Sequence, residues 1–403
     1  MTSHILRTQV GIIGAGPAGL LSSHLLHLCG IDSIVIEARS RFHIEERTRA
    51  GMLDPATVQV LTGSGVGARM HAEGLSHTGT QFHFRGATHR VDFQALTGQS
   101  IMIYGQREIV KDLIAARLAS GGQILFDAST VALNAVDSGN PCITFDRDGD
   151  SYRVECDFII GSDGFHGVCR PSIARFISVF EQAHSIGWLG VLAESPPISG
   201  EIVYACHERG LALFSMRSPS ISRMYLQCSA AEDLGQWPDE RIWDELRARL
   251  DDRGSDLVGG RILEKTVFPL RSFVAEPLQH GKLFLVGDAA HIVPPSAAKG
   301  LNLAVADTCL LVDALVRFYR DKSETLLKAY SRTALSAIWE TQRFSQWMTA
   351  LLHRGARGTS FERRVQLAEL DALVHSSSAV LNFATSYVGK SIDEFRPRIR
   401  GAA

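Results

Sequence analysis

A glycine-rich turn near the N-terminus constrains the fold of this 403-residue chain more than any other feature. Gly14, Gly16 and Gly19 have the spacing G-x-G-x-x-G. A short apolar run (10–13) precedes them, and a segment of helical pattern (17–28) follows. Glycine at these positions permits a tight turn, lets the backbone approach a pyrophosphate and lets the helix pack closely on the strand. The segment is therefore predicted to begin a βαβ unit that binds phosphates at a helix N-terminus.

Glu37 completes this unit. It follows a second apolar run (33–36), where an acidic side chain accepts hydrogen bonds from the hydroxyls of a ribose. A glycine turn alone is weak evidence, because such turns also occur in βαβ units without a ligand. The strand, the helix, the second strand and the terminal acid together predict an adenine dinucleotide.

Two later apolar runs also end at an aspartate. Residues 158–161 lead to Asp163, and residues 282–286 lead to Asp288. Open α/β sheets bind ligands at the carboxyl ends of their strands, so both carboxylates are candidates for nucleotide contacts, Asp288 with a ribityl chain. The alternatives are a helix cap for Asp288 and a turn for Asp163.

A helix is predicted to begin after the second of these motifs, at Gly300, Leu301 and Asn302. Its free amides would point at a flavin carbonyl. Three nucleotide-type motifs in one chain, in the order glycine turn, Asp-Gly and Gly-Asp, favour FAD over NAD as the bound cofactor.

Composition limits the partners. Lys and Arg total 41 against 43 Asp and Glu, which argues against a dedicated nucleic-acid-binding protein. The N-terminus lacks a signal-peptide pattern, and the run at 10–13 is far too short to cross a membrane. Seven scattered cysteines without paired spacing predict reduced thiols in a cytoplasmic protein. His24 and His27 have no further ligands at zinc-like spacing, so we expect surface histidines and no metal site.

The predicted fold is α/β, or α+β overall. A discontinuous Rossmann-like FAD-binding domain takes residues 1–180 and 268–307. Short alternating runs predict an antiparallel-sheet substrate domain (181–267), half buried on one face. Helical periodicity predicts a C-terminal helical region (308–391), and residues 392–403 are expected to form a loose tail.

The order and wording of these motifs resemble the single-component FAD-dependent aromatic monooxygenases, and among them the hydroxybenzoate hydroxylases. The similarity covers nearly the whole chain, and its most specific segments are 162–167, 186–189, 287–302 and 343–348. Gly167 departs from the serine usual in the wider family and matches the hydroxybenzoate hydroxylases. The resemblance implies 3-hydroxylation of 4-hydroxybenzoate with NAD(P)H and O2, through a flavin C4a-hydroperoxide, by a homodimer that binds no membrane.

The resemblance puts the substrate on the predicted sheet. Ser215, Arg217 and Tyr225 coincide with the family's carboxylate-binding set. A strand-end arginine with a neighbouring hydroxyl suits bidentate capture of an anion, although by spacing alone Arg217 is more often a surface residue. The same resemblance puts Tyr204 against the phenolic oxygen of the substrate.

Oxygen transfer to the ring is electrophilic, so a phenolate reacts far faster than a phenol. The resemblance implies a relay that passes the phenolic proton from Tyr204 to Tyr387 and then to His77, which is expected to titrate near neutrality. Without the resemblance, Tyr387 reads as a core tyrosine and His77 as a surface histidine. Pro295, assigned to the catalytic set, and Ser296 belong to the loop between the ring and the flavin.

The remaining residues implied by the resemblance contact the two nucleotides. The set for FAD is Gly14, Gly16, Gly19, Glu37, Arg47, Arg49, Gln106, Asp163, Asp288, Gly300, Leu301 and Asn302, with Arg49 at the pyrophosphate. The set for the nicotinamide nucleotide is Arg39, Arg41, His43, Phe165, His166, Arg170 and Arg271. In the stretch that sets preference for a 2′-phosphate, Ala38 and His43 replace an arginine and a tyrosine of NADPH-specific members. NADPH is favoured, with NADH as the alternative.

The sequence leaves three classes of function open. The first is the hydroxylase, acting on 4-hydroxybenzoate or on another hydroxy- or aminobenzoate. The second is a flavin-dependent reductase of the same fold that inserts no oxygen and has no need of the carboxylate and tyrosine sets. The third is a protein that binds the dinucleotide without catalysis. Such a protein is expected to have lost Asp288 or the glycines of the turn, and the sequence retains both, which argues against this class.

Overall fold

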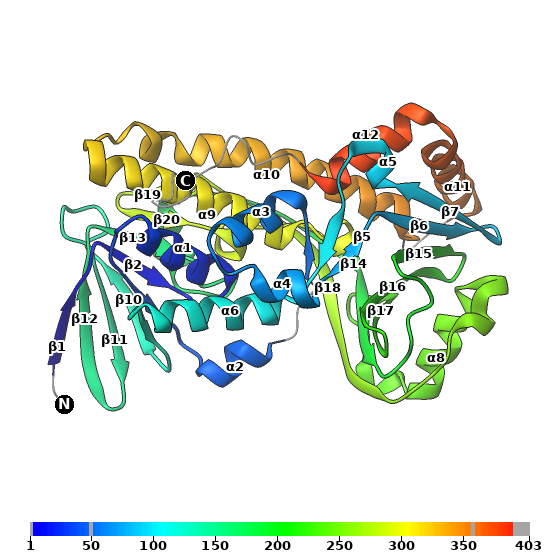
Figure 1. Ribbon diagram of the computed structural model, residues 1–403, viewed down its shortest axis with the longest axis horizontal. Helices are drawn as coiled ribbons and strands as arrows, with labels where there is room; N and C mark the ends of the chain where they lie inside the picture. Colours follow the sequence, from blue (N-terminus) through cyan, green and yellow to red (C-terminus); the bar gives the residue numbers. More distant parts are fainter. Residues whose placement is uncertain (1–2, 48–50, 356–358, 390–403) are drawn as a thin grey trace.

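The computed structural model describes residues 3–47, 51–355 and 359–389, and its glycine turn follows a central strand of a six-stranded sheet (Figure 1). The strand order is β19 (Gln279–His280), β20 (Leu283–Leu285), β13 (Phe158–Gly161), β2 (Val10–Ile13), β3 (Ser33–Ile36) and β9 (Gln123–Leu125). All neighbours pair in parallel except β19 and β20. The three central strands are buried along their whole length, as expected for parallel strands covered on both faces.

The helices of this unit begin where the sequence predicts. α1 (Pro17–Leu28) starts immediately after Gly16, and α9 (Gly300–Asp321) starts at the predicted glycine. α1 packs against α9 and against α6 (Gln106–Ala119). The predicted α/β class, with its Rossmann-like unit, is therefore confirmed.

Smaller elements surround this sheet. A four-stranded sheet has the order β1 (Ser3–Arg7), β12 (Asp150–Glu155), β11 (Cys142–Arg147) and β10 (Ser129–Asn134), and a three-stranded sheet has the order β4 (Met52–Leu53), β8 (Ile101–Ile103) and β5 (Leu75–His77). The shorter helices are α2 (Arg41–Glu46), α3 (Pro55–Gly63), α4 (Ala68–Glu73), α5 (Phe93–Thr97) and α7 (Cys169–Ser172).

The second large sheet has eight strands. Their order is β21 (His291–Ile292), β18 (Ile262–Glu276), β14 (Ser178–Ala193), β17 (Ile221–Ser229), β16 (Gly210–Ser218), β15 (Ile202–His207), β6 (Gly79–Phe84) and β7 (Ala87–Asp92). Neighbours are antiparallel, as predicted, except that β15 and β6 are parallel. β6 and β7 come from the segment predicted to bind FAD, so the sheet reaches further back in the chain than its predicted start.

Each face of the eight-stranded sheet packs against different helices. Leu189, Ala212 and Met224 lie in one hydrophobic cluster with α8 (Asp239–Ala248). Alternate residues point to the other face, where they meet the C-terminal helices. A single strand therefore supplies side chains to two separate cores.

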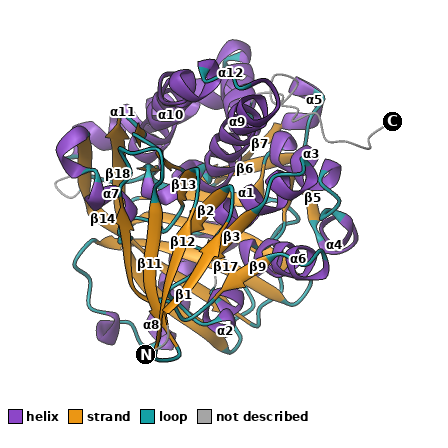
Figure 2. Cartoon of the chain, turned by 90° about the vertical axis from the view of Figure 1, so that its left-hand side faces the viewer, coloured by secondary structure: helices purple, strands orange, loops and turns teal. Residues whose placement is uncertain are grey.

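In the described part of the chain, three helices follow α9. They are α10 (Thr325–Leu352), α11 (Ser360–His375) and α12 (Ser377–Val388). α9 and α10 lie side by side, and α10 extends from the six-stranded sheet towards the eight-stranded sheet (Figure 1). Figure 2 shows α9, α10 and α12 gathered on one side of the strands. Within the described ranges, no helix combines the length and apolar character that a membrane span requires. The predicted tail, 392–403, lies outside the described residues.

Candidate active site

The three glycines of the turn meet different surroundings. Gly14 has a positive φ of 105°, and a Cβ there would lie 2.4 Å from Ser162 O. A Cβ on Gly19 would lie 2.0 Å from Gly14 O, so both positions require glycine for packing. A Cβ on Gly16 would meet nothing within 4 Å. Gly16 therefore leaves open space at the start of α1, and this space fits a pyrophosphate.

Glu37 is held in place at the end of β3. Its side chain is buried, Oε2 accepts a hydrogen bond from Ala15 N at 2.7 Å, and Oε1 accepts one from Arg39 N at 2.8 Å. Each carboxylate oxygen can accept a second hydrogen bond. The residue is thus fixed next to the glycine turn and retains capacity for a ribose hydroxyl.

The Asp-Gly motif is built tightly around Asp163. Its Oδ2 accepts hydrogen bonds from Val168 N at 2.6 Å and Cys169 N at 2.9 Å, while Oδ1 is buried without a partner. Burial raises the pKa of Asp163. A Cβ on Gly167 would lie 2.0 Å from Asp163 Cγ, which explains why this chain has no serine at this position. The unpartnered Oδ1 is available to a ligand hydroxyl or amide.

The Gly-Asp motif meets the start of α9. Asp288 is exposed, and the adjacent Gly287 N donates a hydrogen bond to Asp307 Oδ2 at 3.1 Å. Asn302 bridges two segments, because its Oδ1 accepts from Asp54 N at 3.0 Å and its Nδ2 donates to Met52 O at 3.1 Å. Gly300 and Leu301, which precede Asn302 in the first turn of α9, are partly exposed. An exposed carboxylate and the free amides at the start of α9 are the groups that would hold a ribityl chain and a flavin carbonyl.

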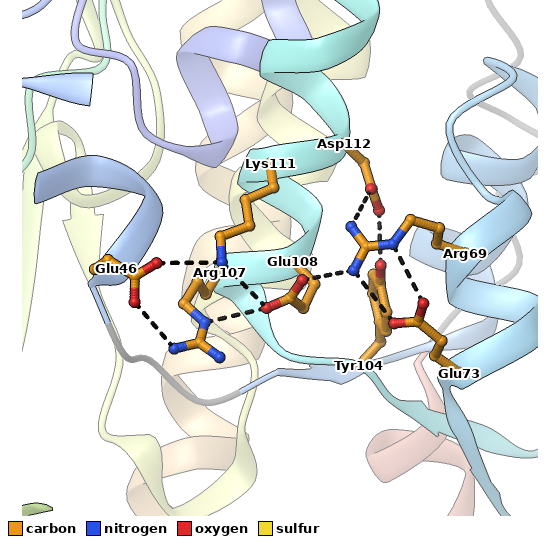
Figure 3. A network of polar contacts seen from close by, with 8 residues as sticks. All are labelled: Glu46, Arg69, Glu73, Tyr104, Arg107, Glu108, Lys111 and Asp112. Carbon is orange, nitrogen blue, oxygen red and sulfur yellow. Dashed lines mark hydrogen bonds and ion pairs between the residues drawn. The ribbon is translucent and has the colours of Figure 1, made fainter. Parts of the chain in front are cut away.

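A network of ion pairs holds the start of α6, where Gln106 is the first residue, against α2 and α4 (Figure 3). Its members are Glu46, Arg69, Glu73, Tyr104, Arg107, Glu108, Lys111 and Asp112. Arg69 donates to Glu108 at 2.6 Å and to Asp112 at 2.7 Å, and Glu46 pairs with Lys111 at 3.3 Å. The network fixes the helix end that carries Gln106 and the end of α2 just before Arg47. Arg49 lies outside the described residues.

The predicted substrate residues lie on one face of the eight-stranded sheet. Tyr204 pairs in register with Leu213, and Leu213 pairs with Tyr225, so both tyrosines belong to one row across three strands. Ser215 follows Leu213 at an alternate position of β16 and therefore points to the same face. Arg217 lies in a bulge between Met216 and Ser218, and its guanidinium reaches back to Ser215.

Arg217 and Ser215 are joined directly. Arg217 Nη1 donates to Ser215 Oγ at 2.9 Å and to Met216 O at 3.0 Å. Burial lowers the pKa of Arg217, while Tyr225 raises it and Arg223 lowers it. Tyr225 and Arg223 therefore both lie close enough to Arg217, the predicted carboxylate anchor, to change its pKa.

Arg223 is a member of the site that the sequence patterns did not single out. It is buried, it pairs with Ser215 across the strands, and its guanidinium carbon lies 5.3 Å from the ring centroid of Tyr225. Its Nη1 lies 3.3 Å from Glu264 Oε1. The sequence could have indicated this residue, because Arg223 is two positions before Tyr225 on the same predicted strand and should face the same side of the sheet. The two arginines make this part of the sheet suitable for an anion.

The two predicted relay tyrosines are in contact. The hydroxyls of Tyr204 and Tyr387 are 2.6 Å apart, and both side chains are buried. Tyr204 Oη also lies 3.3 Å from the carbonyl oxygen of Ser296, the residue after Pro295. Burial raises the pKa of Tyr204 above its usual range and that of Tyr387 to about 12. A buried lysine that the sequence analysis did not name, Lys299, donates from Nζ to the backbone oxygen of Tyr387 at 2.5 Å.

His77 differs from its predicted behaviour. It is buried at the end of β5, and neither ring nitrogen has a hydrogen-bond partner in the structure, so it is not joined to the tyrosine pair. Burial, opposed by Glu201 and reinforced by Arg217, lowers the pKa of His77 to about 4. The expectation that His77 titrates near neutrality is therefore wrong for this structure, because desolvation of the imidazolium outweighs the nearby carboxylate.

The predicted nicotinamide residues form two groups. In the first, the guanidinium carbons of Arg170 and Arg271 lie 4.7 Å and 4.4 Å from the ring centroid of Phe165, and His166 meets the edge of the same ring. In the second group, on and beside α2, are Arg39, Arg41 and His43, which are exposed. Glu45 would compete with a phosphate for Arg41, because Arg41 Nε lies 2.7 Å from Glu45 Oε1.

The predicted exposure of the two histidines of α1 is correct for one of them and wrong for the other. His27 is exposed, but His24 is buried and its Nε2 lies 2.8 Å from Ser64 O. The expectation of a surface histidine is wrong for His24, because α1 is covered by neighbouring segments on that side as well. Among the described residues, no cluster of three or more His, Cys, Asp or Glu side chains could hold a metal ion.

Known proteins resemble this chain over nearly its whole length. The family described as "FAD binding domain" matches residues 7–345, and the chain belongs to this family of FAD-dependent enzymes. Within it, the p-hydroxybenzoate hydroxylase of Acinetobacter baylyi is 43% identical over 396 residues, which cover 96% of this chain and 98% of that protein. This chain is accordingly an FAD-dependent aromatic monooxygenase that uses NAD(P)H and O2.

Solved structures agree with this assignment of fold. The p-nitrophenol 4-monooxygenase of Pseudomonas putida superposes with a TM-score of 0.78 at 16% identity, covering 96% of this chain and 99% of that one. An aklavinone-11 hydroxylase, solved with FAD and aklavinone, superposes with a TM-score of 0.73 at 20% identity, covering 86% of this chain and 69% of that one. The predicted architecture, an FAD-binding unit with a substrate sheet and C-terminal helices, is shared with these enzymes.

Proposed function

We propose that this enzyme hydroxylates 4-hydroxybenzoate at the 3-position to 3,4-dihydroxybenzoate. The observation that carries the proposal is the presence of an anion-binding arginine and a hydrogen-bonded tyrosine pair on one face of one sheet. Ser215 is two residues along β16 from Leu213, the residue paired with Tyr204, which corresponds to roughly 7 Å.

In this proposal Arg217 and Ser215 bind the carboxylate, and Tyr225 supplies a third donor. The guanidinium presents a planar fork to the anion, and its contacts with Ser215 Oγ and Met216 O hold that fork in one orientation. The arrangement favours a ligand with a carboxylate over one without it, because only the carboxylate supplies a counter-charge to the guanidinium.

Tyr204 and Tyr387 handle the phenolic proton. Tyr204 meets the phenolic oxygen, and its hydroxyl exchanges protons with that of Tyr387 across 2.6 Å. Both tyrosines keep their protons at neutral pH, since burial raises both pKa values, so each can accept one proton only by giving up another. The nearby cations Arg217, Arg223 and Lys299 favour the phenolate form of the substrate.

The remaining roles are proposals of the same kind. Pro295 and Ser296 separate the ring from the flavin. The relay of this proposal consists of Tyr204 and Tyr387, because His77 has a pKa lowered to about 4 and neither of its ring nitrogens bonds to them. When bound, FAD accepts electrons from NAD(P)H and activates O2 for insertion of one oxygen atom. The glycine turn, Glu37, Arg47, Arg49, Gln106, Asp163, Asp288 and residues 300–302 would hold it. Phe165, His166, Arg170 and Arg271, with Arg39, Arg41 and His43, would bind the reductant, with NADPH preferred.

The test is an assay of the purified holoenzyme on a panel of hydroxybenzoates and aminobenzoates. NAD(P)H loss and hydroxylated product are measured together, because their ratio separates hydroxylation from futile peroxide release. We expect one product equivalent per NAD(P)H with 4-hydroxybenzoate. Better coupling with an aminobenzoate, or oxidation of NAD(P)H without product from every compound, would contradict the proposal.

Three further features of the protein are proposed. The chain is divided at about residues 180, 267 and 307, with β6 and β7 added to the substrate sheet, and each of the FAD-binding unit and the two faces of that sheet has its own hydrophobic cluster. The enzyme works in the cytoplasm, which is supported by seven free cysteines. Its assembly as a homodimer rests on the resemblance to its family alone.

A further inference from the structure

A buried histidine lies at the end of α10, outside every set of residues discussed so far. His353 Nε2 is 2.6 Å from Trp188 Nε1, and its Nδ1 is 2.9 Å from Thr349 O. An indole nitrogen can only donate and a carbonyl oxygen can only accept. The ring of His353 must therefore carry its proton on Nδ1 and accept the indole hydrogen bond at Nε2.

His353 is suited to remain neutral. Its side chain is buried, and burial lowers its pKa to about 4, with Thr349 O raising it and His184 lowering it. Protonation at Nε2 would remove the acceptor that Trp188 needs. The neutral ring thus satisfies two buried polar groups at once, and no aliphatic side chain of similar size can do so.

Trp188 connects this histidine to the substrate face of the sheet. It lies on β14 opposite Gln227, two residues from Tyr225 on the neighbouring strand β17. The ring centroids of Trp188 and Tyr225 are 4.9 Å apart, and Phe268 packs against both rings. The position of the indole therefore limits where the Tyr225 ring can lie.

The same turn of α10 also contacts the other side of the site. The hydroxyl of Thr349 donates to Ser345 O at 2.8 Å and thus accepts from Ser296 Oγ, which is 2.9 Å away. Ser296 O in turn faces Tyr204 Oη at 3.3 Å. One helical turn thereby touches the segment beside the phenolic end and, through Trp188, the residue at the carboxylate end.

We propose that His353 is a positioning residue for substrate binding: through Trp188 it fixes Tyr225 at the carboxylate end of the site, from the same helical turn that holds Ser296 near Tyr204. The inference rests on the proposed function, in which Tyr225 donates to the substrate carboxylate. It concerns orientation only, since the side chain of His353 bonds to Trp188 and Thr349, and neither belongs to the proposed substrate or flavin sets.

The test compares His353→Leu, which loses both hydrogen bonds, with His353→Gln, whose amide can replace both. Dissociation constants for 4-hydroxybenzoate and for phenol are measured from the change in flavin absorbance of the holoenzyme. We expect His353→Leu to weaken 4-hydroxybenzoate binding about five- to tenfold, with phenol binding and FAD content unchanged, and His353→Gln to restore most of the loss. KM should rise with little change in kcat.

A double-variant cycle removes the remaining ambiguity. In a Tyr225→Phe background, His353→Leu should add almost nothing, because the hydroxyl that it positions is already absent. If His353→Leu does not fold, Trp188→Phe removes the same hydrogen bond and serves in its place. Unchanged binding, equal weakening of phenol and 4-hydroxybenzoate, or additive effects with Tyr225→Phe would each overturn the inference. A wild-type enzyme that neither binds nor hydroxylates 4-hydroxybenzoate would instead contradict the proposed function.

Discussion

Replacing Arg217 by alanine should weaken 4-hydroxybenzoate binding strongly and leave FAD binding intact. The contacts with Ser215 Oγ and Met216 O both come from Nη1 and hold the guanidinium beside Tyr225, where it can meet the substrate carboxylate. Arg217 lies on the substrate sheet and touches none of the residues proposed to hold FAD. The loss should therefore be confined to the aromatic ligand.

The size of the effect follows from the local geometry. Removing one partner of a desolvated, charge-assisted pair costs about 2–5 kcal/mol. With about 1.4 kcal/mol per factor of ten, this range corresponds to a dissociation constant raised roughly 30- to 4000-fold. Arg217 is only partly buried, and Arg223 remains nearby as a second cation. We therefore expect the lower half of the range, roughly 30- to 300-fold.

The assay is a titration of the holoenzyme with 4-hydroxybenzoate and, in parallel, with phenol, which lacks the carboxylate. Arg217→Ala should affect only the acid, and Arg217→Lys should recover part of its binding because the charge is restored without the planar fork. Ser215→Ala, which removes a hydroxyl of the same set but no charge, is measured for comparison and should cost only a few-fold. A dissociation constant within threefold of wild type, or an equal loss for phenol, would place the carboxylate elsewhere.

Three other changes are informative. Tyr204→Phe should bind substrate but oxidise NAD(P)H mostly without hydroxylation, and Tyr387→Phe should do so more mildly; measured coupling equal to wild type in Tyr204→Phe would refute the relay. Gly167→Ala should reduce FAD affinity and thermal stability by about 1–3 kcal/mol, because the added Cβ would lie 2.0 Å from Asp163 Cγ. Gly200→Ala, at a position with no atom within 4 Å of the added Cβ, is the control and should be neutral in the same melting and flavin-release assays. Replacing both Arg39 and Arg41 by Gln should lower the NADPH-to-NADH ratio of kcat/KM only several-fold, since both are exposed and Arg41 already pairs with Glu45; a strong NADPH preference that survives would shift attention to Arg170 and Arg271.

The sequence predicted four elements around the glycine turn and the Asp-Gly motif to the residue. The strands at 10–13, 33–36 and 158–161 and the helix at 17–28 have the predicted bounds. Glycine turns mark element ends sharply there, and buried parallel strands read as uninterrupted apolar runs. The substrate strands were also found, because alternation of polar and apolar residues is a local signal.

Contacts between segments far apart in the chain could not be predicted from these local patterns. β6 and β7 join the substrate sheet by pairing with β15, more than 100 residues later, and nothing local in 79–92 indicates that partner. Trp188 and His353 are 165 residues apart, so neither could be recognised as half of a buried pair. The burial of His24 and the low pKa of His77 have the same origin, since both depend on what other segments lay over them.

The alternation of the substrate sheet also limits how this enzyme can change over generations. Tyr204, Ser215 and Tyr225 share a face because each sits at the matching parity of its strand, and Arg217 joins them from a bulge next to Ser215. Deleting one residue at the start of β16 would turn Ser215 towards the apolar layer beside α8 and bring Phe214 to the substrate. New substrate ranges in this lineage should therefore arise by exchange of side chains at fixed positions, with gain or loss of residues confined to the turns between strands.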